Sequence, residues 1–232
     1  MYNIIDIHSH LLPNVDDGSK DLSMSLDVLK KQESVGVKKI VLTPHYKGDV
    51  YNITASELQK IFLDFKTKVK EAGLNVQLYL GQEIYCDSSI YDNLKSGVVS
   101  TLNGTKYLLL EFNYFEETDI ADYVHNLTTM GYIPIIAHVE RYTYLDWNTI
   151  FDLKQMGALI QVNASSIIGE NGRRVQKYLL KAMSKGLIDF VSSDIHMMRQ
   201  TSLDKAYKKI SKTLGEEVAK RVLYDNALKI TD

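Results

Sequence analysis

The opening of the chain holds two histidines at a spacing that suits metal binding. The segment Asp6-Ile7-His8-Ser9-His10 closes an apolar run that begins at Ile4. Side chains two residues apart on a strand point to the same face, so His8 and His10 can approach one ion. For such a pair alone, two buried histidines that hydrogen-bond within a core are the alternative interpretation.

Other residues of ligand type follow at the ends of later apolar runs. Three more histidines and three acids share this placement: His45, His138, His196, Glu83, Glu111 and Asp194. In a parallel β/α barrel the carboxyl ends of the strands converge on one mouth, so these residues would meet in space. So many ligands exceed the needs of one ion, and a carboxylate that bridges two or three divalent metals is the economical arrangement. Mixed imidazole and carboxylate ligands favour Mn, Fe or Zn over Ca.

The elements that would position these residues alternate between strand and helix. Seven runs predict strands: Ile4–Ile7, Lys39–Thr43, Val76–Ile84, Tyr107–Glu111, Ile133–Ala137, Ala158–Val162 and Ile188–Ser192. Several runs are almost continuously apolar, as expected for strands that are covered on both faces in a parallel sheet. Glycines such as Gly131 precede several of them, in the position that ends a helix.

Amphipathic helices are predicted between these runs. Thr54 and Glu57 have the spacing of a capping box before one of them, and two helical patterns close the chain around Leu203–Leu214 and Val218–Leu228. We find no linker rich in proline or serine and no low-complexity segment. The 232 residues are therefore expected to form one α/β domain of barrel type, over residues 1–232.

Composition narrows the classes of function. The chain has 27 basic and 29 acidic residues, which gives no positive field for binding nucleic acid. No window approaches the roughly 20 apolar residues of a membrane span, and the first residues resemble a strand and not a secretion signal. We therefore expect a cytoplasmic protein that does not insert into a membrane.

Six segments, in order along nearly the whole chain, carry a resemblance to a known family. They are Asp6-Ile7-His8-Ser9-His10-Leu11-Leu12-Pro13, Val15-Asp16-Asp17-Gly18, Thr43-Pro44-His45-Tyr46, Gly81-Gln82-Glu83, Ala137-His138-Val139-Glu140-Arg141-Tyr142 and Ser193-Asp194-Ile195-His196. Together they resemble the PHP (polymerase and histidinol phosphatase) superfamily. The second and fifth segments are more narrowly similar to the manganese-dependent protein-tyrosine phosphatases of bacterial capsular and exopolysaccharide gene clusters.

The resemblance implies a distorted seven-stranded (β/α)7 barrel that holds three divalent metal ions, with Mn preferred and Fe or Zn as alternatives. The family pattern assigns the first ion to His8, His10, Glu83 and Asp194, the second to Glu83, Glu111 and His138, and the third to Asp17, His45 and His196. Asp16 is adjacent to Asp17, and the distance from His10 in the family pattern selects Asp17.

Two arginines complete the implied catalytic site. Arg141 matches a family arginine that binds the phosphate, a role that suits the planar guanidinium fork. A second family arginine follows the Asp-x-His motif, and the nearest one here, Arg199, lies closer to His196 than the pattern requires. The implied mechanism has a metal-bridging hydroxide that attacks phosphorus in line, while metal and Arg141 neutralise the phosphoryl oxygens.

Aromatic and basic residues near these segments are candidate substrate contacts. Tyr114, Tyr142 and Tyr144 offer rings that could sandwich a phosphotyrosine, with ordinary packing as the alternative. The segment Gly169–Arg174 lacks the Gly-Lys-Ser/Thr of a P-loop and predicts a turn and a helix start, in which Arg173 or Arg174 is a candidate auxiliary contact.

Other catalytic chemistries lack their motifs. Cys86 is the single cysteine, and the residues after it, Asp87 to Asp92, contain no arginine and place an acid beside the thiol. The nucleophile elbow G-x-S-x-G of serine hydrolases is also missing.

The implied substrate is a phosphotyrosine protein, namely a tyrosine kinase of polysaccharide assembly. Two alternatives stay open: a small-molecule phosphomonoesterase of the histidinol-phosphatase type, and an inactive PHP scaffold module. The complete ligand set argues against the scaffold, because a cluster of carboxylates is destabilising without its cations. The sequence does not indicate an oligomeric state.

Overall fold

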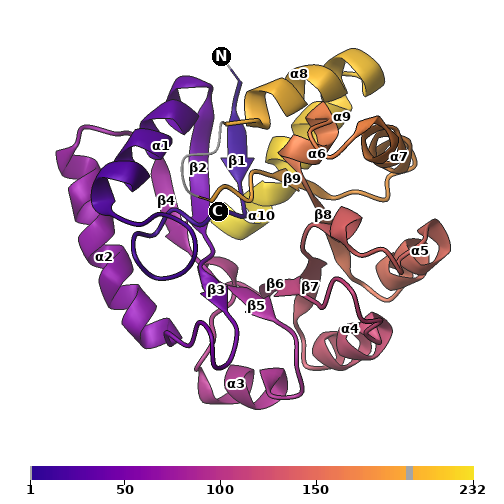
Figure 1. Ribbon diagram of the computed structural model, residues 1–232, viewed down its shortest axis with the longest axis horizontal. Coiled ribbons are helices and arrows are strands. Elements are labelled where there is room, and N and C mark those ends of the chain that lie inside the picture. The colour runs from indigo at the N-terminus through magenta and orange to yellow at the C-terminus, as the bar shows by residue number, and fades with distance from the viewer. Residues whose placement is uncertain (1, 197–200) are drawn as a thin grey trace.

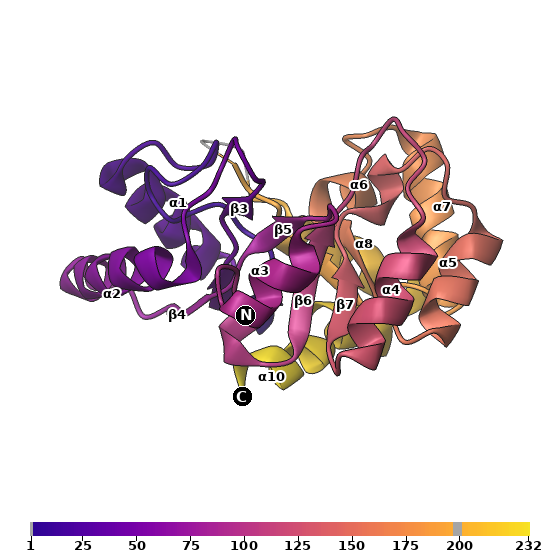
Figure 2. The same ribbon diagram turned by 90° about the horizontal axis from the view of Figure 1, so that it is seen from below.

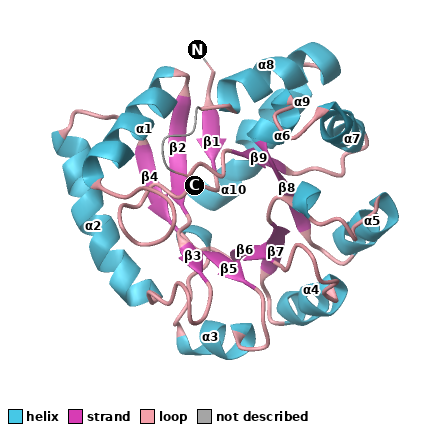
Figure 3. Cartoon of the chain, in the orientation of Figure 1, coloured by secondary structure: helices cyan, strands magenta, loops and turns pink. Residues whose placement is uncertain are grey.

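A ring of parallel strands surrounded by helices makes up the protein. The computed structural model describes residues 2–196 and 201–232. The strands lie at the centre and the helices on the outside (Figure 1), and Figure 3 separates the two by colour. The predicted α/β class is therefore confirmed.

Within the described residues the strands form two sheets. The smaller sheet has the order β1-β2-β4 and the larger one β3-β5-β6-β7-β8-β9, with every pair parallel. The strands are β1 (Ile4–Asp6), β2 (Val37–Leu42), β3 (His45–Tyr46), β4 (Gln77–Leu80), β5 (Glu83–Tyr85), β6 (Tyr107–Glu111), β7 (Ile133–Ile136), β8 (Leu159–Asn163) and β9 (Phe190–Ser192).

Two breaks distinguish this arrangement from the predicted seven-stranded barrel. The chain that forms β2 is interrupted before β3 at Pro44, which has no N–H to donate to a strand ladder. The predicted strand Val76–Ile84 divides into β4 and β5 at Gly81, where an added Cβ would lie 2.6 Å from Leu102 Cδ2. The seven runs therefore account for eight of the nine described strands, and β3 lies outside all of them. The (β/α)7 count is not reproduced strand for strand.

The two sheets also meet where the residues after β1, in the smaller sheet, lie beside those after β9, in the larger sheet. Ser9 and Ile195 form a parallel bridge. The His10 N–H donates to Ile195 O at 3.1 Å, and the Asp194 N–H donates to His8 O at 2.9 Å. These bonds hold the residues after β1 directly beside those after β9.

The helices follow the strands as the alternation predicts. They are α1 (Leu22–Ser34), α2 (Ala55–Glu71), α3 (Ile90–Ser96), α4 (Ile120–Thr129), α5 (Trp147–Gln155), α6 (Ala164–Ile168), α7 (Arg173–Ser184), α8 (Leu203–Leu214), α9 (Glu216–Lys220) and α10 (Asn226–Thr231). Short 3-10 turns cover Leu102–Gly104 and Val139–Arg141, and a π turn, Arg221–Asp225, joins α9 to α10. The predicted capping box of Thr54 and Glu57 is confirmed at the start of α2. No helix in the described part of the chain is both long and apolar enough to span a bilayer.

The buried apolar residues form an inner and an outer layer. The outer layer lies between the strands and the surrounding helices, and the inner one fills the ring. Ala227 and Ile230 of α10 belong to the inner layer, and Figure 2 shows α10 lying across one end of the strands. On β6, Leu109 faces inward, so the alternation of a strand also places Glu111 on the inner side.

Candidate metal and phosphate site

All nine sequence-predicted metal ligands lie together at the mouth of the ring. Their ligand atoms form four overlapping groups, and the atoms of each group lie within 4.8 Å of one another. The groups are His8, His10 and Asp194; His8, Glu83 and His138; His45, Glu83 and Glu111; and His10, Asp17, His45 and His196. Residues from six separate parts of the chain thus converge on one small volume.

Glu83, the first residue of β5, lies at the centre of these groups. Its Oε2 atom is 3.1 Å from His8 Nε2, 3.2 Å from His10 Nε2 and 3.1 Å from His45 Nδ1. Its Oε1 atom is 2.7 Å from His138 Nε2. One buried carboxylate therefore faces four imidazoles with both oxygens, which is the geometry of a carboxylate shared between cations.

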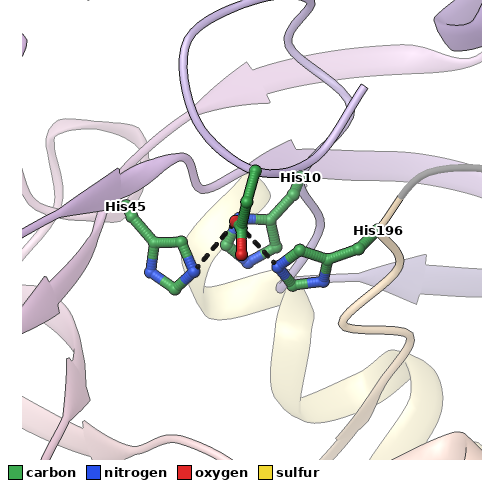
Figure 4. Close-up of side chains that lie close together, drawn as sticks. His10, His45 and His196 are labelled. Atoms are coloured by element: carbon green, nitrogen blue, oxygen red, sulfur yellow. Dashed lines mark ion pairs between the residues drawn. The ribbon is translucent and has the colours of Figure 1, made fainter. Parts of the chain in front are cut away.

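The two adjacent acids of the Val-Asp-Asp-Gly segment face different partners. Asp17 Oδ1 lies 3.5 Å from His45 Nε2 and 3.3 Å from His196 Nε2, as the dashed lines in Figure 4 mark. Asp16 Oδ2 instead accepts hydrogen bonds from His10 Nδ1 at 2.7 Å and from the His45 N–H at 3.1 Å. Asp17, and not Asp16, therefore lies within ligand distance of His45 and His196.

The residues assigned to the second ion do not form a single group. Glu111 Oε1 and His138 Nε2 are 3.8 Å apart. Glu111 groups with His45 and Glu83, whereas His138 groups with His8 and Glu83. Glu83 is the residue that both groups share.

Gln161, which the sequence analysis missed, determines which nitrogen of His8 carries the proton. Gln161 Oε1 accepts from the backbone N–H of His138 at 2.7 Å, and this donor fixes the orientation of the amide. His8 Nδ1 lies 3.2 Å from the same oxygen and must therefore donate to it. When His8 is neutral, its Nε2 atom therefore has its lone pair toward the carboxylates, as metal-binding histidines require.

The same side-chain network continues to Asp194. Gln161 Nε2 donates to Asn163 Oδ1 at 2.9 Å, and Asn163 Nδ2 donates to Asp194 Oδ2 at 2.7 Å. Both residues lie on the inner face of β8, where the outward neighbours Ile160 and Val162 are apolar. Two polar residues at alternate positions of an otherwise apolar strand were the signal that could have identified them.

Two of the predicted ligands have a strained backbone. His138 has a φ of 32° and Asp194 a φ of 46°, in the left-handed region that non-glycine residues rarely adopt. His138 lies two residues after the end of β7, and Asp194 lies two residues after the end of β9. The unusual backbone angle therefore directs each side chain into the mouth of the ring. Strain of this kind is typical of functional sites.

The electrostatics of the site suit bound cations. Glu83 Oε2 and Asp194 Oδ1 are buried and have no hydrogen-bond partner in the described part of the chain. Burial opposes ionisation of a carboxylate, but the imidazoles of His8 and His45 outweigh it and hold the pKa of Glu83 well below its usual range. The charges of His8 and Arg141 likewise outweigh burial and lower the pKa of Asp194. Two ionised and incompletely paired carboxylates fit a divalent metal.

Arg141 extends from the 3-10 turn Val139–Arg141 to the edge of the metal-ligand cluster. Its Nη2 donates to Asp194 Oδ2 at 2.5 Å and its Nη1 donates to the Tyr114 hydroxyl at 3.2 Å. The Tyr114 hydroxyl in turn donates to Glu111. The side chain of Arg141 keeps 34% of its surface exposed and therefore remains accessible to a ligand.

A cavity of about 290 Å³ opens over these residues. It is lined by Asp17, His45, Lys47, Tyr51, Glu111, Tyr114, Arg141 and His196. Of the three predicted aromatic contacts, Tyr114 lines this cavity and Tyr142 and Tyr144 do not. The Tyr142 hydroxyl accepts a hydrogen bond from the Phe112 N–H at 3.0 Å, and the Tyr144 hydroxyl donates one to Asn113 O at 2.9 Å. Arg199, the second predicted arginine, lies outside the described residues.

Cys86 does not belong to the site. Its side chain is buried in the outer apolar layer, with 6% of its surface exposed. Burial and the neighbouring Asp87 raise the pKa of the thiol well above its usual value. The structure therefore agrees with the exclusion of a cysteine nucleophile.

The family profile described as "Capsular polysaccharide synthesis, CpsB/CapC" matches residues 4–232. The chain belongs to this family. It is 32% identical to the tyrosine-protein phosphatase CpsB of Streptococcus agalactiae serotype V over 98% of both chains. It is 29% identical to the tyrosine-protein phosphatase YwqE of Bacillus subtilis, over 93% of this chain and 87% of that one.

Solved structures agree with this assignment. A chain from the crystal structures of YwqE from B. subtilis and CpsB from Streptococcus pneumoniae, described as metal-dependent tyrosine phosphatases, superposes with a TM-score of 0.92 at 27% identity. The match covers 98% of this chain and 94% of that chain. Histidinol phosphate phosphatase from Lactococcus lactis has a TM-score of 0.60 at 13% identity, which shows a shared fold alone.

Proposed function

We propose that this protein is a metal-dependent protein-tyrosine phosphatase whose substrate is a phosphorylated tyrosine kinase of capsule or exopolysaccharide assembly. The observation that carries the proposal is the cluster of nine ligand-type residues around Glu83, with Arg141 beside it at an open cavity. Relatives of nearly the same length that are named tyrosine-protein phosphatases support the choice of substrate class. We further propose that residues 1–232 act as one domain in the cytoplasm.

Three divalent ions, with Mn preferred, are part of the proposal. The nine residues fit such ions because they offer only nitrogen and oxygen donors, and because buried oxygens of Glu83 and Asp194 have no partner in the described part of the chain. When bound, these ions supply an acidified water and positive charge for the phosphoryl oxygens.

The residues of the chain have separate tasks in this proposal. Gln161 and Asp16 hold His8 and His10 with their Nε2 atoms toward the ligand cluster. Arg141 presents N–H donors to the phosphoryl oxygens, and Asp194 and Tyr114 hold its guanidinium in place. A phenolate, with a pKa of about 10, is already a tolerable leaving group.

The two alternatives are less well supported. The likeness to histidinol phosphate phosphatase is a likeness of fold, at 13% identity. An inactive scaffold would need neither nine residues of ligand type nor the contacts by which Gln161 and Asp16 set the tautomers of His8 and His10.

A metal-dependent assay tests the proposal. The purified protein is stripped of metal, supplied with Mn, Fe, Zn or no ion, and incubated with a phosphotyrosine peptide, a phosphoserine peptide and histidinol phosphate. We expect hydrolysis of the phosphotyrosine peptide that requires added metal and is abolished by a chelator. Full activity after exhaustive metal removal, or a preference for histidinol phosphate, would overturn the proposal.

A further inference from the structure

A second, largely apolar pocket lies next to the candidate active site. Its volume is about 370 Å³, and its lining includes Val139, Tyr142, Leu145, Trp147, Ile150 and Tyr178. The rings of Trp147 and Tyr178 are stacked with their centroids 3.6 Å apart. Trp147 begins α5 and Tyr178 lies within α7, so the stacked pair brings together two helices on the outside of the ring.

This aromatic pocket is continuous with the catalytic end of the molecule. A polar cleft of about 610 Å³ begins at Arg141 and Asp194. Glu140 and Val175 line both the cleft and the aromatic pocket. Glu140 and Arg141 are consecutive residues, with Cα atoms about 3.8 Å apart. A segment whose phosphate contacts Arg141 can therefore reach the aromatic pocket within a few residues.

The cleft between the two sites is suited to a peptide backbone. Its lining includes uncharged side chains that donate and accept hydrogen bonds, among them Ser165, Asn171 and Ser202. Glu140 Oε1 accepts from the Asn163 N–H at 2.9 Å and from Ser166 Oγ at 2.7 Å. Glu140 Oε2 is buried and has no hydrogen-bond partner among the residues described.

We propose that the aromatic pocket binds an aromatic side chain of the substrate polypeptide, located a few residues from the phosphotyrosine. An aromatic ring fits the lining because offset or edge contacts with Trp147 and Tyr178 add to the burial of apolar surface. The exposed guanidinium of Arg174 at the edge of the pocket favours a ring further through its cation–π contact. This inference rests on the proposed function and adds a determinant of substrate sequence to it.

A peptide series measures the preference directly. Phosphotyrosine peptides of one length carry a single Phe at each position from three residues before to three residues after the phosphotyrosine, and Ala elsewhere. With Mn present, we expect one position at which Phe raises kcat/KM roughly tenfold over Ala through a lower KM. Leu at that position should give a smaller gain.

Substitutions then identify the pocket as the origin of the preference. Trp147→Ala should reduce the ratio of kcat/KM for the Phe and Ala peptides to about one, and Trp147→Phe should restore most of it. Phe151→Ala is the matched control, because Phe151 lies on the same helix with 51% of its surface exposed and does not line the pocket. The ratio is measured within each variant, so a general loss of stability does not affect it.

Fluorescence provides a readout that does not depend on turnover. Trp147 is the single tryptophan of the chain. Titration with a Phe peptide that carries a non-hydrolysable phosphonate should change the emission of Trp147, and titration with the corresponding Ala peptide should not.

The results separate this inference from the proposed function. Hydrolysis of all peptides at one rate would refute the pocket assignment and leave the phosphatase proposal standing. A preference that survives in Trp147→Ala would refute it as well. Failure to hydrolyse any phosphotyrosine peptide would refute the proposed function itself.

Discussion

Replacing Arg141 by alanine separates phosphate binding from metal binding. The guanidinium donates to Asp194 and Tyr114 and keeps a third of its surface exposed, beside the cavity above the ligand cluster. Loss of such a charged donor from a transition state costs about 3–4 kcal/mol, which lowers the rate roughly 10²- to 10³-fold. We expect this loss in kcat/KM for an aryl phosphate at saturating Mn.

The fold and the metal content should survive this substitution. Asp194 Oδ2 keeps its hydrogen bond from Asn163 Nδ2 at 2.7 Å when Arg141 is removed. The destabilisation should therefore stay within about 1–3 kcal/mol, or roughly 2–4 °C in Tm for each kcal/mol. Arg141→Lys should recover little activity, because the two contacts depend on the separate Nη1 and Nη2 atoms of a planar fork.

Kinetics, metal analysis and thermal unfolding of each variant decide the outcome. Arg221→Ala is the matched control, since Arg221 is exposed in the π turn before α10 and lines neither the cavity nor the polar cleft. Wild-type kcat/KM in Arg141→Ala would refute the assignment. A loss of metal together with activity would show that Arg141 acts through Asp194. A severe defect only in Arg199→Ala would place the main phosphate contact in the segment after His196.

Further perturbations test the ligand cluster and its support. Addition of Mn at about 100 times its Kd should stabilise the protein by about 2.7 kcal/mol, which is measured as a higher Tm. The His10→Ala variant should lose most of this increase in Tm, and its turnover should fall by several orders of magnitude. Gln161→Leu should weaken Mn binding about 10- to 100-fold in a calorimetric titration, whereas Gln161→Glu keeps the acceptor for His8 and should weaken it less. Cys86→Ser and thiol alkylation of the native protein should leave phosphatase activity unchanged, because the thiol is buried and its pKa is raised.

The positions of the ligand-type residues were predictable because they follow from strand geometry. Parallel strands bring their carboxyl ends to one mouth, so His8 after β1, Glu83 after β4 and Asp194 after β9 had to converge once the strands were identified. The sequence places Glu111 at the end of the run Tyr107–Glu111, and the alternation of β6 places it on the inner face with Leu109.

Features that depend on contacts distant in the sequence were not predictable. The run Val76–Ile84 was predicted as one strand, and its break at Gly81 becomes evident only when Leu102 packs against that glycine. The place of α10 across the end of the ring likewise depends on Ala227 and Ile230 meeting the inner layer. Gln161 could be recognised as a support for His8 only after β7 and β8 were paired.

The tautomers of two histidines show why this arrangement suits a cation. His8 Nδ1 donates to Gln161, and His10 Nδ1 lies 2.7 Å from Asp16, so each imidazole turns its Nε2 lone pair toward the other across 3.1 Å. Glu83 Oε2 lies 3.1 Å and 3.2 Å from these two nitrogens and adds a full negative charge. Three acceptor atoms at these distances repel one another unless a positive charge lies among them. A proton on His8 or His10 relieves the repulsion at one nitrogen, and the neighbouring carboxylates raise the pKa of both histidines although burial opposes this. Because Gln161 and Asp16 hold the two rings from opposite sides, a divalent ion between them would relieve the repulsion at all three atoms at once.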